Sequence, residues 1–252
     1  MAKTILFAGK EFPDGKDLAS GAVFQGRKAI ITCGVKIDEN GEEVLDADVE
    51  KAKQNNVKIL SWNRGSVLSA RTLVISCENE GGADEAVLVF DEQLFASKFG
   101  SSYENSKILE ELIGSYEYLA QEIVSRFSRN QNQKRKIVFL YKSNPTICES
   151  ITSSALKTSA VQLSYSLVAA AGGAFRAFAE NMAAELVSSA NITPLLVSCD
   201  YTNDLSGRDS SLAVWLCEYL DSVDALKKPL SPKQKISWIK AGARNPGGFG
   251  LF

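Results

Sequence analysis

Apolar and polar positions divide the chain into short strands and longer helices that alternate along its length. Short, uniformly apolar runs are typical of buried strands, whereas apolar residues at every third or fourth position indicate amphipathic helices. Strands that alternate with helices predict an α/β fold built on a parallel sheet. The strands are predicted at 4–8, 29–34, 57–62, 82–89 (a turn and then a strand), 136–141, 193–198 and 236–239, and the helices at 16–25, 46–56, 66–77, 107–127, 162–189 and 211–226.

The longest predicted helix, residues 162–189, carries small residues in its middle. Leu163, Leu167 and Leu186 belong to a series of apolar positions at steps of three and four, which is helical spacing. The pair Gly172-Gly173 lies inside this series, and a glycine inside a helix costs about 1 kcal/mol relative to alanine. We therefore expect another backbone, from a neighbouring helix or a bound ligand, to approach the helix closely there.

Composition and charge exclude several classes of partner. The chain has 252 residues, of which 45% are hydrophobic and 23% are charged, as is usual for a soluble globular protein. A formal net charge of −2 offers no basic field for nucleic acid and no polybasic patch for a membrane surface. No apolar run approaches the length of a transmembrane helix, and the first residues enter a strand pattern at once, so no signal peptide is expected. We predict a single cytoplasmic domain over residues 1–252.

The side-chain inventory restricts the available chemistry. There is no histidine, which excludes Ser-His-Asp triads, histidine acid–base catalysis and imidazole zinc sites. The five cysteines, at positions 33, 77, 148, 199 and 217, form no Cys-x-x-Cys pair, which fits reduced thiols in a cytoplasm. Catalysis would need Tyr, Lys, Ser, Cys or carboxylates, or a bound cofactor. No metal site is predicted.

Two stretches resemble signatures of one known family. Residues 176–186 (RAFAENMAAEL) and residues 66–89, which end in GADEAVLV, resemble sequences of the short-chain dehydrogenases/reductases. The resemblance implies a doubly wound, Rossmann-like fold with a mostly parallel seven-stranded sheet and helices on both faces. It also implies a homodimer or homotetramer, in which helices 107–127 and 162–189 pair with their copies in a second subunit.

The turn after the first strand resembles the glycine-rich phosphate loop of that family. Gly9, Lys10 and Gly15 are the residues that would hold a nicotinamide nucleotide, NAD or NADP, if one binds. Pro13 stands where the family has its middle glycine, and proline has no N–H to offer a pyrophosphate. We therefore expect nicotinamide nucleotides to bind weakly or not at all.

Acidic residues weaken the resemblance at the nucleotide site further. Glu11 and Asp14 bring negative charge to a helix N-terminus where phosphates would lie. The fourth strand ends in Asp91-Glu92-Gln93, whereas the family has Asn-Asn-Ala-Gly at this place to shape its adenine pocket. A small-molecule ligand remains compatible with the sequence.

The catalytic Tyr-x-x-x-Lys pair of the family is missing. Counting back from Leu186, the two positions are Val168 and Gly172, which cannot donate a proton. Tyr165 lies one turn earlier and has no lysine four residues on, so we interpret it as structural. Tyr103 and Lys107 match the spacing but precede the wrong helix.

The remaining catalytic positions of the family are also altered. Its supporting Asn corresponds to Glu111, and its catalytic Ser corresponds either to Ser143, directly after the fifth strand, or, counting back from the long helix, to Ser154 or Ala155. The insertion that causes this ambiguity is about a dozen residues long, and its serines are also explained as loop residues and helix caps.

Three hypotheses on function remain open at this point. The first is a non-catalytic member of the family, a pseudoenzyme kept as a binding or scaffold protein. The second is a divergent NAD(P)-dependent oxidoreductase, or a lyase, with relocated groups such as Glu111, Ser143, Lys142, Asp91 and Glu92. The third is a structural subunit of a larger assembly. Whether the cleft above Gly9 is open or filled by side chains discriminates best among them.

Overall fold

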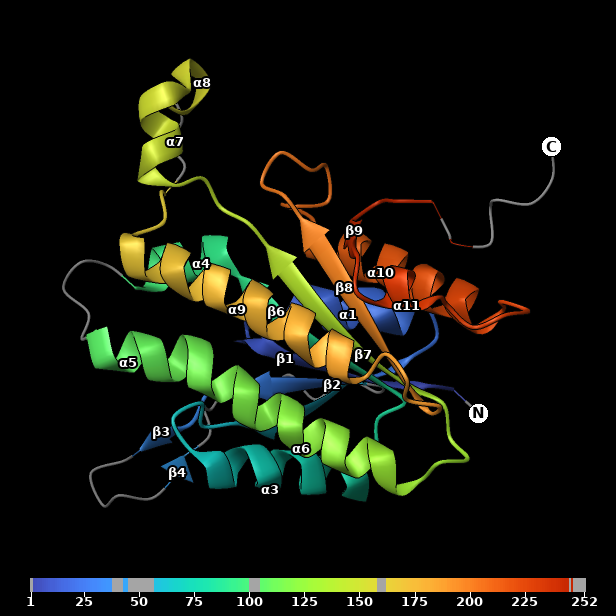
Figure 1. Cartoon of the computed structure of the whole chain (residues 1–252). Coiled ribbons are helices and arrows are strands. Elements are labelled where there is room, and N and C mark those ends of the chain that lie inside the picture. Colours follow the sequence, from blue (N-terminus) through green and yellow to red (C-terminus); the bar gives the residue numbers. More distant parts are fainter. Residues whose placement is uncertain are drawn as a thin grey trace, which may run out of the picture.

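A seven-stranded parallel sheet forms the centre of the molecule, with strand order β5-β2-β1-β6-β7-β8-β9 (Figure 1). The computed structural model describes residues 2–37, 43–44, 57–99, 105–157, 162–244 and 246. The strands are β1 (Thr4–Phe12), β2 (Lys28–Cys33), β5 (Val57–Ser61), β6 (Glu85–Asp91), β7 (Arg135–Lys142), β8 (Ile192–Cys199) and β9 (Trp238–Lys240), and β3 (Lys36–Ile37) pairs with β4 (Glu43–Val44) in a separate antiparallel ribbon.

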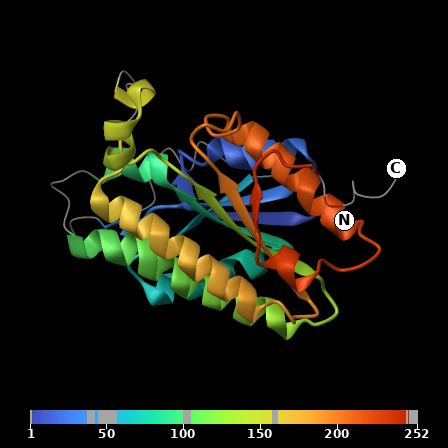
Figure 2. The same ribbon diagram turned by 45° about the horizontal axis from the view of Figure 1, so that its top comes forward.

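Helices cover both faces of this sheet, as Figures 1 and 2 show. One face carries α3 (Val67–Asn79), α4 (Glu92–Lys98), α5 (Asn105–Leu109), the π-helical segment Glu110–Gly114, α6 (Ser115–Arg129) and α9 (Ser166–Glu185). The other face carries α1 (Lys16–Phe24) and α10 (Asp209–Asp224), and α11 (Pro232–Lys235) precedes β9. The predicted doubly wound, mostly parallel seven-stranded sheet is confirmed.

The central strands are apolar on both faces because both faces are covered. In β6, Ala86, Leu88 and Phe90 contribute to the core under α6 and α9. Their neighbours Val87 and Val89 contribute to the core under α1 and α10. Side chains of a strand point alternately to its two faces, so a continuous apolar run fills both cores at once.

The first strand is longer than the sequence predicts. It was expected to end at Gly9 in a phosphate-loop turn, but β1 continues to Phe12, which pairs with Cys33 of β2. Gly9 lies within the irregular part of this pairing and has φ = +100°, a conformation that only glycine adopts easily. The prediction of a turn at Gly9 is therefore wrong, since the glycine adds an irregularity to the strand and does not end it.

Two predicted helices differ from the observed ones in detail. The helix predicted at 162–189 is α9, Ser166–Glu185, because the preceding residues approach the loop after β7, where Ser164 pairs with Thr146 in an isolated bridge. The helix predicted at 107–127 consists of α5, the π-helical segment and α6. The helix predicted at 46–56 lies outside the described residues.

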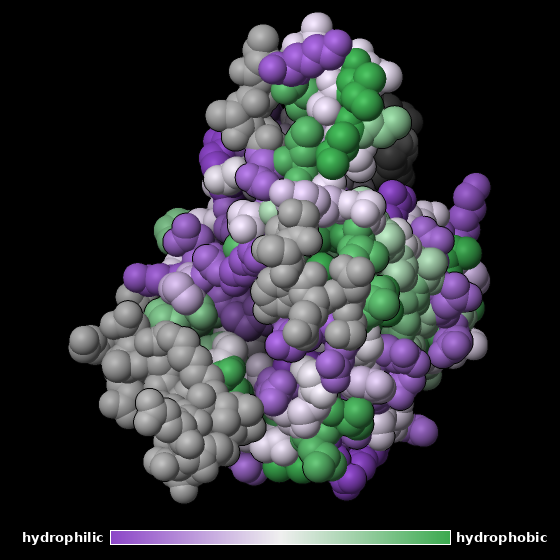
Figure 3. Space-filling view, turned by 90° about the vertical axis from the view of Figure 1, so that its left-hand side faces the viewer, coloured by the Kyte–Doolittle hydropathy of each residue, from purple (hydrophilic) through white to green (hydrophobic). Residues whose placement is uncertain are grey.

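Two short helices between β7 and α9 form an arm that stands away from the body (Figure 1). It contains α7 (Ile147–Thr152) and α8 (Ser154–Lys157), in which no described residue is buried. A capping box between Thr146 and Glu149 starts α7. Hydrophobic side chains gather on the arm's surface (Figure 3), and Ile147 and Ile151 are 49% and 68% exposed.

Candidate functional site

The carboxyl ends of the parallel strands bring the chemically interesting residues together. In open α/β sheets, ligands bind outside these ends, at the point where the strand order reverses. Here the order reverses between β1 and β6. Lys10 lies near the end of β1, Asp91 ends β6 and Lys142 ends β7, so the place where ligands would be expected is lined by charged side chains.

Two lysines and two aspartates form a closed ion-pair cluster at this edge, which we call the lysine–aspartate quartet. Lys10 Nζ lies 2.6 Å from Asp91 Oδ2 and 2.5 Å from Asp209 Oδ2. Lys142 Nζ lies 3.0 Å from Asp91 Oδ2 and 2.6 Å from Asp209 Oδ1. Each lysine thus contacts both aspartates, and the quartet joins β1, β6 and β7 to the start of α10.

The ion pairs of the quartet shift the pKa values of Asp91 and Lys10 in opposite directions. Burial by itself would raise the pKa of Asp91, but Lys142 and Lys10 outweigh it and lower the pKa of this carboxyl below its usual range. Burial would likewise lower the pKa of Lys10, and the carboxylates of Asp91 and Asp209 raise it above its usual range. Asp91 therefore stays ionised and Lys10 stays protonated at neutral pH.

An arginine fills the neighbouring space beside Gly9. Arg64, from the segment after β5, donates from Nε to Glu11 Oε1 at 2.7 Å and from Nη2 to the Gly9 carbonyl at 2.5 Å. Its guanidinium carbon lies 5.1–5.2 Å from the ring centres of Trp62, Phe95 and Tyr116. Cation–π contacts of this kind are strongest where water is excluded, and Arg64 is enclosed on several sides here.

Tyr116 closes the remaining space at Gly9. Its hydroxyl donates to the Val89 carbonyl at 2.6 Å. A Cβ atom on Gly9 would lie 2.6 Å from the Tyr116 hydroxyl and even closer to the Val89 carbonyl oxygen. Burial raises the pKa of Tyr116 well above its usual value, so the phenol stays protonated. The absence of a side chain at Gly9 thus leaves room for the Tyr116 hydroxyl and the Val89 carbonyl.

The three residues named for a nucleotide have other partners in this structure. The carbonyl of Gly9 accepts from Arg64, the ammonium of Lys10 belongs to the quartet, and Gly15 precedes α1 without room for a Cβ against the Lys10 carbonyl. The open cavity of about 300 Å³ above the quartet is also lined by Asp17. This donor set does not fit a pyrophosphate, because both ammonium groups are already paired and carboxylates surround them.

The positions of the missing catalytic pair lie inside the protein. Val168 and Gly172 share the buried face of α9 with Phe175 and Ala179, as predicted. A Cβ on Gly172 would lie 3.2 Å from the Tyr141 hydroxyl and 3.5 Å from Glu92 Oε2. The neighbours that lie close to Gly172 are therefore side chains and not the backbone that was expected, and among the described residues no atom lies within 4 Å of a Cβ on Gly173.

A larger cavity, of about 430 Å³, opens beside Gly172 at the ends of β6, β7 and β8, and we call it the Tyr141 cavity. The Tyr141 hydroxyl donates to Glu92 Oε2 at 2.6 Å, and the Asn144 backbone N–H donates to the same oxygen at 3.3 Å. Arg176 lies over the Tyr141 ring, 5.5 Å from its centre. The cavity is lined by Glu92, Tyr141, Ser143, Asn144, Thr146, Glu149, Ala169, Arg176, Asp200, Tyr201 and Thr202.

The acid–base character of this cavity is limited. Burial first, and the Glu92 carboxylate second, raise the pKa of Tyr141 far above its usual value of about 10. A phenol with such a pKa is a poor proton donor at neutral pH. Asn144 donates its amide hydrogens to the Gln162 carbonyl and to Ser164 Oγ, and its buried Oδ1 has no partner in the described part of the chain.

The two serine candidates are separated by the fold. Ser143 lines the Tyr141 cavity, and its hydroxyl accepts from the backbone N–H of Tyr201 at 3.2 Å. Ser154 and Ala155 lie in α8, on the arm, and do not line the cavity. Of the positions that the sequence left open, Ser143 is the one at the ends of the strands.

Glu111, Tyr165 and Lys107, three other candidates from the sequence, do not line either cavity. The carbonyl of Glu111 accepts from Arg64 Nη1 and from the Ser115 hydroxyl, and burial raises the pKa of its carboxyl. Tyr165 is the residue that precedes α9, and its side chain does not cap the helix. Tyr103 lies outside the described residues. Lys107 belongs to α5, as expected for a residue on the wrong helix.

Sequence reasoning missed three residues that shape this region: Arg64, Arg176 and Asp209. Arg64 lies two residues after a predicted strand, and charged residues near strand ends could have been collected as candidates. Asp209 begins α10, far away in sequence, and only the fold brings it to Lys10 and Lys142. Arg176 was considered only as part of a fold signature.

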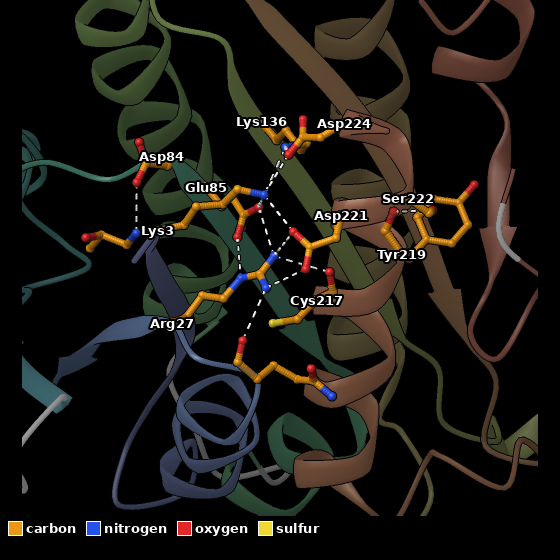
Figure 4. A network of polar contacts seen from close by, with 12 residues as sticks. Lys3, Arg27, Asp84, Glu85, Lys136, Cys217, Tyr219, Asp221, Ser222 and Asp224 are labelled. Atoms are coloured by element: carbon orange, nitrogen blue, oxygen red, sulfur yellow. Dashed lines mark hydrogen bonds and ion pairs between the residues drawn. The ribbon is translucent and has the colours of Figure 1, made fainter. Parts of the chain in front are cut away.

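The opposite edge of the sheet holds a second ion network (Figure 4). The carboxylates of Glu85, Asp221 and Asp224 come close enough together to hold a cation. Arg27 lies 3.3 Å from Glu85 and 2.7 Å from Asp221, and Lys3 and Lys136 lie 2.7 Å and 2.6 Å from Asp224. Side-chain cations therefore balance this acidic group, which ties β1, β6 and β7 to α10.

Known structures resemble this fold over nearly its whole length. The chain is similar to a short-chain dehydrogenase from Mycobacterium smegmatis (14% identity, TM-score 0.59, covering 97% of this chain and 93% of that one). It is also similar to the carbonyl reductase Sniffer of Caenorhabditis elegans (12%, 0.59, 97% and 99%). A third match is a 3-ketoacyl-(acyl-carrier-protein) reductase from Brucella melitensis in complex with NADH (12%, 0.56, 94% and 96%).

Sequence comparisons add no closer relative: no family model matches the chain, and no curated protein does. At 12–14% identity the structural matches show the fold alone. The chain has the fold of the short-chain dehydrogenases/reductases, as the sequence resemblance predicts. Among the described helices, none is both long enough and apolar enough to cross a membrane.

Proposed function

We propose that this chain is a non-catalytic binding protein built on the short-chain dehydrogenase/reductase fold, and that it works without a nicotinamide nucleotide. The observation that carries this proposal is the filled space around Gly9. Arg64 donates a hydrogen bond to the Gly9 carbonyl, and the side chains of the lysine–aspartate quartet fill the space at the ends of β1, β6 and β7. A nucleotide would have to break several buried ion pairs before any phosphate contact formed, and breaking such pairs is costly.

The missing catalytic groups support the same proposal. Carbonyl reduction of the family's type needs a tyrosine to pass a proton and a lysine to lower its pKa, and Val168 and Gly172 supply neither. General acid–base help is worth about 10²–10⁴ in rate. Tyr141 points at Glu92 and has a raised pKa, so it does not replace the missing acid.

The Tyr141 cavity is the place where we propose that a ligand binds. Its size lies within the usual range for small-molecule sites, about 300–1,000 Å³. Arg176 offers a positive charge at its wall, while Glu92 and Asp200 offer acceptors. A small polar molecule that carries both an anionic group and hydrogen-bond donors suits this lining better than an apolar one.

Titration with nicotinamide nucleotides tests the proposal directly. Isothermal titration calorimetry with NAD, NADH, NADP and NADPH is expected to show a dissociation constant weaker than about 1 mM, which corresponds to about −4 kcal/mol of binding free energy. NADPH oxidation against a panel of aldehydes and ketones is expected to stay at the uncatalysed rate. Binding in the low micromolar range, or turnover of the unmodified protein, would contradict the proposal.

Relocated catalysis is the second candidate function, and one observation favours it. Glu92 and Ser143, two of the groups considered from the sequence, line the same cavity as Tyr141. If the carbonyl panel reveals turnover, Ser143→Ala and Glu92→Gln should each abolish it. The exposed variant Ser128→Ala, on the far end of α6, is the matched control and should leave the rate unchanged.

A homodimer or homotetramer is also proposed, with α6 and α9 at the interface. The outward face of α9 carries Ala170, Gly173, Ala177 and Ala184, all exposed within this chain. Such small residues let a second backbone approach closely. Closed two-fold symmetry is the commonest way in which identical chains associate.

Light scattering after size-exclusion chromatography measures the mass of the assembly and so tests this prediction. The unmodified chain is expected at twice or four times the monomer mass of 27.3 kDa. Ala177→Arg places a long charged side chain on the proposed interface and should shift the protein towards the monomer. Ala225→Arg, an exposed alanine after α10, is the control and should not. A monomeric unmodified protein at micromolar concentration contradicts the proposal.

A further inference from the structure

A cavity of about 240 Å³ lies at the amino-terminal edge of the sheet, at the opposite ends of the strands from the Tyr141 cavity. Its lining residues come from the beginnings of β7 and β8, the turn after α9, and the segment that joins α10 to α11. A water molecule needs about 10–15 Å³ of such space, so the cavity has room for a small molecule. We call it the lysine cavity, since its lining includes Lys134, Arg135, Lys136, Lys227, Lys228 and Lys235.

The charges of this lining are unbalanced. Asp224 is the acidic residue of the lining, and it already pairs with Lys136 at 2.6 Å and with Lys3 at 2.7 Å. In the part of the chain that the structure describes, the other five cationic side chains of the lining take part in no ion pair. A protein with a net charge of −2 thus gathers unpaired positive charge around one hollow.

Lys235 shows this imbalance most clearly. The residue is only 8% exposed, and its Nζ donates to the Val187 carbonyl at 2.7 Å. Burial lowers its pKa below the ordinary value, and no carboxylate raises it again. Buried lysines normally have a counter-charge. Lys10, Lys136 and Lys142 each pair with a carboxylate, whereas no ion pair is seen for Lys235 among the described residues.

Arg135 is the second incompletely satisfied cation of the lining. It donates from Nη1 to the Arg126 carbonyl and from Nη2 to Gln133 Oε1, whereas its buried Nε has no partner within the described residues. Buried donors without a partner are rare in proteins. Two incompletely satisfied cations therefore adjoin the same hollow.

We propose that the lysine cavity binds a small multivalent oxyanion, of the kind that carries two or more phosphate groups. Five unpaired cations exceed what a single monovalent anion could neutralise, and lysine ammonium groups bind phosphates as compact point charges. The cavity is bounded by turns and helix ends on several sides, which suits a compact ligand. This site is independent of the Tyr141 cavity and of the absent nucleotide chemistry.

Inorganic pyrophosphate is the probe that tests this site. Isothermal titration calorimetry at low ionic strength should show one binding event per chain, tighter for pyrophosphate than for orthophosphate. In the double variant Lys227→Gln/Lys228→Gln, we expect the dissociation constant to rise about tenfold or more, because two charge-assisted contacts to the oxyanion are lost. Both lysines are exposed, so the variant should fold normally.

A matched charge control separates a built site from general attraction. Lys16→Gln/Lys28→Gln removes the same charge from exposed positions around α1 and β2, and should change the dissociation constant by less than about twofold. An equal loss in both double variants would overturn the proposal, as would the absence of pyrophosphate binding to the unmodified protein.

Lys235→Met provides an independent second variant. The methionine keeps an unbranched side chain in the buried position but removes the charge, so pyrophosphate binding should weaken by about tenfold or more. The thermal midpoint of the ligand-free variant should not fall, since the unmodified residue is buried without a counter-charge. Unchanged binding in Lys235→Met together with unchanged binding in the Lys227/Lys228 variant would exclude the site.

Discussion

Asp91→Asn is expected to lower the free energy of unfolding by about 3–5 kcal/mol, the usual cost of removing one partner from a buried ion pair. Asparagine keeps the size of the side chain, and its Oδ1 can still accept from the Leu94 N–H at the start of α4, as Asp91 Oδ1 does. What changes is the charge. Lys10 and Lys142 would have to share the single carboxylate of Asp209 in a buried setting.

The pH dependence of this difference is a second signature. The pKa of Asp91 in the folded protein is lowered relative to its usual value, so its ion pairs contribute stability above the unfolded pKa of about 3.9. That contribution is lost as the pH falls through the folded pKa. Urea unfolding of both proteins should therefore show the full difference at pH 7 and a smaller one below about pH 4.

An exposed ion pair gives the control for this prediction. Asp14 and Lys98 lie 2.7 Å apart with side chains that are 36% and 45% exposed. Asp14→Asn should lower the free energy of unfolding by less than about 1 kcal/mol, as is usual for surface pairs. If Asp91→Asn lowers the free energy of unfolding by no more than this control, the quartet does not hold the ends of the strands together. The proposal that the chain works without a nicotinamide nucleotide would then lose one of its main supports.

The fold was predictable from the sequence because its signals are local. Each central strand is an uninterrupted apolar run, as in β6 and β7, and each long helix repeats its apolar positions at helical spacing. The predicted ends of strands and helices were wrong where contacts with distant parts of the chain determine them. β1 extends past Gly9 because Phe12 pairs with Cys33 of β2, and no pattern in the sequence around either residue predicts this pairing.

The candidate site was predictable only in part, and for a related reason. The replacement of the catalytic pair by Val168 and Gly172, and the acidic end of the fourth strand, could be read residue by residue. The side chains that fill the space around Gly9 and Lys10 could not be predicted in this way. Arg64 and Asp209 come from two distant segments, and their contacts with Gly9 and Lys10 depend on how those segments fold onto the sheet.

Gly9→Ala is expected to be among the most destabilising single substitutions in this chain, because two costs combine at this position. The residue has φ = +100°, and an alanine in such a conformation costs about 1–3 kcal/mol. Its Cβ would also collide with the Val89 carbonyl oxygen and the Tyr116 hydroxyl. Overpacking of this kind costs about a further 1–3 kcal/mol.

Gly81→Ala separates the two costs. Gly81 has φ = +105°, nearly the same as Gly9, but no atom of the described residues lies within 4 Å of the place where an alanine Cβ would stand. The loss of unfolding free energy in Gly81→Ala thus measures the backbone cost, and the additional loss in Gly9→Ala measures how tightly the space above Gly9 is filled. We expect this additional loss to be about 1–3 kcal/mol, and guanidinium chloride unfolding can measure it.

Combining Gly9→Ala with Tyr116→Phe identifies the group that fills the space. Removal of the hydroxyl takes away one of the three nearest atoms that the new Cβ would meet, the others being the Val89 carbonyl oxygen and a ring carbon of Tyr116. The two substitutions should therefore couple by about 0.5 kcal/mol or more in a double-mutant cycle. Equal losses in Gly9→Ala and Gly81→Ala, without coupling to Tyr116, would mean that the space opens easily. A nucleotide could then enter it, and the proposal of a binding protein that works without one would have to be abandoned.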